Sequence, residues 1–123
     1  MQWFRKFAVA ITGITNSVRN HHSFRVHALV SLAVFGVATW LPIAMWRWVA
    51  LVLAVTLVWT AELLNTSLEE LVRAIHPEQD QRVGRALDAA AGGVLVASIG
   101  AAAIGLLTLG PPLWARISII IVG

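Results

Sequence analysis

The chain has 123 residues, of which 59% are hydrophobic, nine are Lys or Arg, six are Asp or Glu and none is Cys. So few charges, with a mean hydropathy of +0.80, exclude a water-soluble domain of this length, and we expect a single-domain, all-α integral membrane protein. The net charge of +3 does not require a nucleic-acid partner, because basic side chains facing anionic lipid headgroups account for it.

The first segment, residues 2–20, is predicted to be an amphipathic helix at the membrane surface. Its apolar part, Phe7–Ile14, is too short to cross a bilayer and runs into Arg19, His21 and His22. The segment also lacks the small-residue cleavage pattern that ends a secretory signal peptide.

Three later segments are long and apolar enough to span a membrane, which takes about 20 helical residues. They cover residues 24–41, 46–70 and 86–109. Pro42 and Pro77 interrupt the chain between them, and Pro111-Pro112 is expected to end the third span, because proline removes a helical hydrogen bond. Residues 110–123 are then expected to form a short tail.

The distribution of basic residues predicts the orientation. Most of them lie before the first span or between the second and third, so the positive-inside rule places the N-terminus and the second connection in the cytoplasm. The opposite interface is expected to carry a belt of tryptophans, at Trp40, Trp46, Trp48 and Trp114.

The carboxylates all lie in one window on the predicted cytoplasmic side: Glu62, Glu69, Glu70, Glu78, Asp80 and Asp88. Glu62 directly follows the uncharged run 48–61, and an ionisable group at the edge of a span is costly enough to indicate a function. Because a helix turns about 100° per residue, Glu62, Asn65 and Glu69 share one face. This polar stripe is expected to face a partner helix, a cation or a polar substrate group rather than lipid.

Small residues recur every four positions in the third span, at Gly93, Ala97, Ala101 and Gly105. This ladder predicts close packing between helices, which would bring Asp88 near the polar stripe. Glu70 and Asp80 are most simply solvated charges. His27 is expected either to take part in the site or only to bond a neighbouring backbone group or carboxylate.

The segment from Glu62 to Glu69 resembles the E-x-x-N-[ST]-[AS]-[IL]-E signature of the small prokaryotic diacylglycerol kinase and undecaprenol kinase family. Other segments resemble the family at matching spacing: Phe7-x-x-Ala10-x-x-Gly13, Asn20 to His27, Pro77-Glu78 and Ala86 to Leu95. The resemblance covers roughly residues 7–109, which is nearly the whole chain.

The resemblance implies a homotrimer with shared active sites in the bacterial inner membrane, which transfers the ATP γ-phosphate to a lipid alcohol with the help of Mg²⁺. By position, Glu62 is implied as the base and Asn65 as the residue that holds the hydroxyl or the transferred phosphate. Glu69 is implied as a magnesium ligand, and His21 occupies the position of a second one. The remaining implied contacts are with the nucleotide, through Glu69, Glu78 and Asp88, and with the acceptor, through Asn20, Arg25 and Glu62.

The chain departs from the family pattern at several positions. His21 stands where a metal-binding Glu is usual, Leu87 where a phosphate-binding Lys is usual, and Arg73 where an Asp is usual. Gln79-Asp80 replaces Tyr-His. Arg85 and Arg73 are therefore candidates to bind phosphate in place of Leu87, and Glu70 or His22 to complete the metal shell.

Two other classes of function are weighed against the kinase. A catalytically altered or silent member of the fold, acting as a scaffold or lipid binder, is favoured by Leu87 and His21. A small transporter or channel would need polar residues towards both faces, whereas the outer halves of these spans are apolar. The acceptor is either diacylglycerol or undecaprenol, and the segment ending at His27 is closer to the undecaprenol kinase branch.

Overall fold

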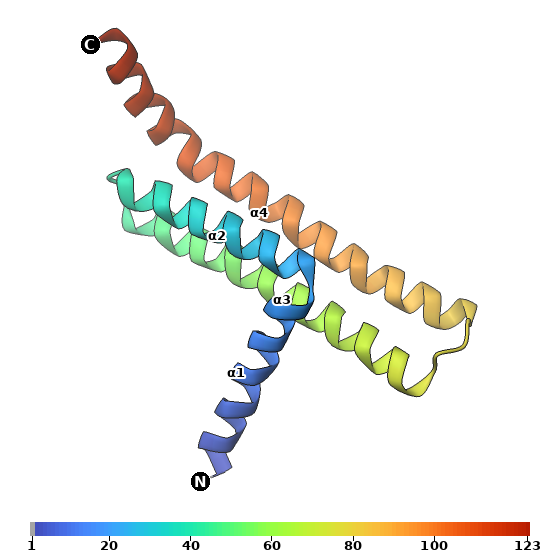
Figure 1. The fold of residues 1–123 in the computed structure, drawn as a ribbon. Helices are drawn as coiled ribbons and strands as arrows, with labels where there is room; N and C mark the ends of the chain where they lie inside the picture. Colours follow the sequence, from blue (N-terminus) through green and yellow to red (C-terminus); the bar gives the residue numbers. More distant parts are fainter. Residues whose placement is uncertain (1) are drawn as a thin grey trace.

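The computed structural model describes residues 2–123, which form four helices (Figure 1). They are α1 (Gln2–Asn20), α2 (His22–Trp40), α3 (Met45–Ile75) and α4 (Gln81–Val122). Three of these, α2, α3 and α4, are long and apolar enough to cross a membrane. The predicted all-helical architecture is therefore confirmed, and three of its helices fit the predicted spans by length and hydropathy.

The centre of the molecule is a hairpin of α3 and α4, which lie side by side along most of their length (Figure 1). With 31 residues, α3 is about 46 Å long and extends past the start of α2. α1 leaves the other helices at a steep angle (Figure 1). The far ends of α3 and α4, with the turn that joins them, thus project beyond the three-helix part (Figure 1), whereas Glu62 lies beside α2.

Local chemistry explains the turn between the two long helices. α3 ends at Ile75, because a residue that precedes proline, here His76 before Pro77, is disfavoured in the helical region. Asp80 then caps α4, and its Oδ1 accepts a hydrogen bond of 2.7 Å from the backbone N–H of Arg82.

Two buried clusters hold α2 against the hairpin. Phe24 is fully buried, and its ring meets that of Trp59 edge to face at a centroid distance of 5.7 Å. Trp59 Nε1 donates a hydrogen bond of 3.1 Å to Ser31 Oγ. At the opposite end, Ala38 and Leu41 pack in a cluster with Leu51 and Leu109.

The C-terminal part differs from the sequence prediction, because α4 does not end at Pro111-Pro112 but continues past them. The two prolines lack the N–H groups that would donate to the carbonyls of Leu107 and Thr108, four residues earlier. Arg47, in the first turn of α3, donates instead: its Nη1 lies 2.6 Å from Thr108 O and 3.5 Å from Leu107 O. The prediction was wrong because a side chain from the neighbouring helix can replace both lost hydrogen bonds.

Candidate functional site

Glu62 is buried, with 5% of its surface exposed, although it is ionisable and lies within an apolar helix. Its Oε2 lies 3.8 Å from Nε2 of His27, which approaches from α2. Thr66, one turn further along α3, is also buried. The carboxylate therefore faces the other helices, and His27 contacts a carboxylate, one of the roles that the sequence left open for it.

The polar stripe continues along α3 as predicted from the helical spacing. Asn65 Nδ2 donates a hydrogen bond of 3.0 Å to Glu69 Oε1. The other polar atom of this amide, Asn65 Oδ1, is buried and has no hydrogen-bond partner. Buried acceptors are nearly always paired in folded proteins, so this oxygen is available to a further partner.

A second ionic group lies beside the stripe, on the exposed edge of α3. His21 Nε2 lies 3.7 Å from Glu70 Oε1, and Arg73 Nη1 contacts the same oxygen at 3.1 Å. His21 thus meets Glu70, and its role as a metal ligand together with Glu69 stays a prediction. Among residues 2–123, no three His, Asp or Glu side chains come close enough to form a metal site by themselves.

The predicted nucleotide contacts lie around the turn between α3 and α4. Glu78, Arg85 and Asp88 are all exposed there. A hollow of about 550 Å³, which we call the turn hollow, occupies the same region. Its lining includes Glu78, together with Arg73 from the end of α3 and Leu87 from the start of α4.

The predicted acceptor residues Asn20 and Arg25 lie at the corner between α1 and α2. Arg25 Nη2 donates a hydrogen bond of 2.6 Å to the backbone carbonyl of Arg19, in the last turn of α1. Arg25 therefore satisfies a helix end and fixes this corner. Asn20 is exposed at the same place.

The ladder of small residues on α4 leaves open faces within the protomer. A Cβ atom added at Gly93 or Gly105 would meet nothing within 4 Å, so neither glycine is needed for close approach within the protomer. Ala101 and Gly105 instead line a groove. Which helix packs against the ladder stays a prediction, because helix spacing shows which residues share a face but not which surface that face meets.

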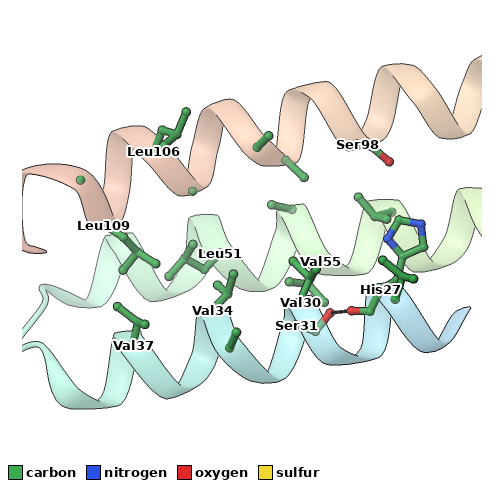
Figure 2. A pocket seen from close by; sticks show the side chains of 18 of the residues that line it. His27, Val30, Ser31, Val34, Val37, Leu51, Val55, Ser98, Leu106 and Leu109 are labelled. Atoms are coloured by element: carbon green, nitrogen blue, oxygen red, sulfur yellow. Dashed lines mark hydrogen bonds between the residues drawn. The ribbon is translucent and has the colours of Figure 1, made fainter. Parts of the chain in front are cut away.

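The groove lies between α2, α3 and α4 and encloses about 680 Å³; we call it the apolar groove (Figure 2). Its walls are aliphatic along most of their length. Polar side chains line it only towards one end, where His27, Ser31 and Ser98 lie (Figure 2). This is also the end at which His27 approaches Glu62, so a polar group in the groove would lie close to the buried carboxylate.

Comparisons with known proteins relate the chain to lipid kinases. A family model described as prokaryotic diacylglycerol kinase matches residues 8–109. The undecaprenol kinase of Bacillus subtilis is 31% identical over 112 residues, which cover 91% of each chain. A diacylglycerol kinase of Synechocystis sp. is 34% identical over 108 residues, which cover 87% of this chain and 62% of that protein.

Proposed function

Because the chain belongs to the prokaryotic diacylglycerol kinase family and is a lipid kinase, we propose that it phosphorylates the primary alcohol of diacylglycerol or undecaprenol, with ATP as donor and Mg²⁺ as cofactor. One observation carries the proposal. A buried carboxylate, Glu62, lies 3.8 Å from His27, which lines the polar end of a groove that is otherwise apolar. An amphipathic alcohol fits this polarity, because its tail can lie along the aliphatic walls while its hydroxyl reaches Glu62.

Glu62 is proposed as the general base. The acceptor oxygen attacks the γ-phosphorus of ATP, its proton passes to the Glu62 carboxylate, and the bond from the γ-phosphorus to the β-phosphate oxygen breaks to release ADP. His27 is proposed to position the Glu62 carboxylate, because its Nε2 lies 3.8 Å from Glu62 Oε2 and so restricts rotation of that side chain.

The residues of the polar stripe fit a magnesium ion. Mg²⁺ prefers hard oxygen ligands and is commonly held by one or two protein oxygens together with phosphates and waters. The unpartnered Asn65 Oδ1 and the carboxylate of Glu69 offer such oxygens one turn apart. When bound, the ion would neutralise charge on the transferred phosphate. Asn65 would then hold either this ion or the phosphoryl group. His21, which contacts Glu70, remains a proposed second ligand of the ion.

The nucleotide is proposed to lie between the polar stripe and the turn hollow, with Glu69, Glu78 and Asp88 as contacts. Arg85 and Arg73 are the proposed phosphate-binding cations, because Leu87 offers no charge. Arg73 lines the turn hollow directly, and Glu70 holds its guanidinium at 3.1 Å. Arg85 is exposed near the start of α4.

We further propose that the protein acts as a homotrimer with shared active sites in the bacterial inner membrane, with the carboxylates facing the cytoplasm. The ladder supports this proposal, because the open face of Gly93 offers a surface for a helix of another copy. The exposed apolar side chains of α1, such as Trp3, Phe4 and Phe7, support its placement as an amphipathic helix on the membrane surface. Asn20 and Arg25 would then lie where the acceptor arrives.

The first experiment measures transfer of labelled γ-phosphate from ATP to diacylglycerol and to undecaprenol in parallel, with and without Mg²⁺, using purified protein in detergent micelles. Glu62→Gln is expected to lower transfer by about 10²- to 10⁴-fold. Asp80→Asn is the matched control, because Asp80 is exposed, is not the proposed base, and the amide keeps the side-chain oxygen that caps α4. A folded, oligomeric protein that phosphorylates neither alcohol would favour a catalytically silent member of the family.

A further inference from the structure

The last part of α4, which we call the C-terminal arm (residues 113–122), lies beyond the segment that the family model matches. Residues 88–109 alone give about 33 Å of helix, which already crosses a hydrocarbon layer of about 30 Å. The arm adds about 15 Å and leaves the line of the preceding helix at the end remote from Glu62 (Figure 1). Its surroundings therefore need an explanation of their own.

Apart from Arg116 and Ser118, the arm carries only apolar side chains. Trp114, Ile119 and Ile121 expose 74%, 69% and 76% of their surfaces, and Val122 exposes 85%. A helix that is apolar all round is not stable when surrounded by water. Association with another helix is also disfavoured, because helices that pair in membranes present small residues, whereas the arm carries mostly branched and aromatic ones.

Two contacts determine where the arm begins. Arg47 satisfies the carbonyls that Pro111-Pro112 leave free, so the helix can pass the prolines in a poorly hydrated environment. Arg116 then lies over the ring of Trp40, the last residue of α2, at 5.2 Å from its centroid. Tryptophan is enriched at headgroup level, so this contact ties the first turns of the arm to the membrane interface.

The distribution of charged side chains indicates which group contacts the arm at the membrane interface. No Asp or Glu side chain lies at this end of the chain, since all six fall between Glu62 and Asp88. Arg47 and Arg116 therefore have no carboxylate side chain to neutralise them, and lipid phosphate is the anion available at an interface. We propose that the C-terminal arm is an anchor that lies along the membrane interface in the leaflet opposite Glu62, with Arg116 at the phosphates and the isoleucines in contact with the acyl chains.

This proposal does not depend on the kinase reaction and can be tested on the intact protein. Because the chain has no cysteine, single-cysteine variants need no background replacement. A nitroxide is attached at Ile119→Cys, Ile120→Cys and Ile121→Cys in liposomes that contain phosphatidylglycerol. Collisions with oxygen report lipid, and collisions with a water-soluble nickel chelate report water. Leu106→Cys provides the control for the lipid-facing span, and Gln79→Cys the control for the aqueous turn.

All three arm positions are expected to collide with oxygen and hardly with nickel, as Leu106→Cys does. Nickel access like that of Gln79→Cys would place the arm in water, and protection from both agents would place it against another protein chain; either result overturns the proposal. Arg116→Leu is expected to shift the arm labels deeper, because the phosphate contact is lost, whereas Arg82→Leu should not. Unchanged depth in Arg116→Leu would refute the role of Arg116.

Discussion

Replacing Arg47 with methionine should destabilise the protein only as long as Pro111 and Pro112 are present. The guanidinium donates to Thr108 O at 2.6 Å and, at the limit of a hydrogen bond, to Leu107 O at 3.5 Å. A charge-assisted hydrogen bond contributes about 1.5–3 kcal/mol, and a carbonyl left unpaired in lipid adds a further cost. We therefore expect Arg47→Met to lower the free energy of unfolding by about 2–4 kcal/mol.

The test is a double-mutant cycle with Pro111→Ala/Pro112→Ala. The two alanines restore backbone N–H groups that donate to the same carbonyls, so in this background Arg47→Met should cost less than about 1 kcal/mol. The stacking of Arg47 over Trp46, at 4.6 Å, is present in both backgrounds and cancels in the cycle. Unfolding by SDS in mixed micelles, followed by circular dichroism, measures all four variants. An equal cost of Arg47→Met in both backgrounds would refute the reasoning.

The remaining predictions concern packing and the site. Phe24→Ala should lower the stability by about 3–5 kcal/mol, because the ring is fully buried, whereas Leu32→Ala, at a position 71% exposed, should change it little in the same SDS titration. Asn65→Leu should raise the Mg²⁺ concentration needed for half-maximal transfer, since an unpartnered oxygen is removed; an unchanged magnesium titration would contradict this. Arg73→Ala should raise the KM for ATP several-fold, and adding Leu87→Lys should restore it; failure of the second change to rescue the first would count against a shared role.

The sequence was sufficient for the features that depend on one helix alone. Run length and hydropathy predicted three spans, and the helical repeat placed Glu62, Asn65 and Glu69 on one face. The burial of Glu62 followed from its cost in lipid. These inferences need only the composition and the geometry of a single helix.

Features that depend on contacts between helices were not predictable in the same way. The hydrogen bonds from Arg47 to the carbonyls before the prolines join residues about 60 positions apart. No local sequence pattern predicts such a contact. The ladder left its partner undetermined, because spacing within a helix does not specify the surface opposite it. The pairing of His21 with Glu70 likewise depends on how α1 and α2 meet the far end of α3.

The departures at Arg73 and Leu87 are better understood as one rearrangement than as two losses. In the family pattern that this chain resembles, an acid is usual at the first position and a phosphate-binding lysine at the second. The structure places both side chains in the lining of the turn hollow, one from α3 and one from α4. Relative to the family pattern, Leu87 removes a cation from the α4 wall of the hollow, and Arg73 puts a cation in place of an acid on the α3 wall. A hollow that binds phosphate requires positive charge at a suitable distance, not on a particular helix, so the substitutions are compatible with a working kinase.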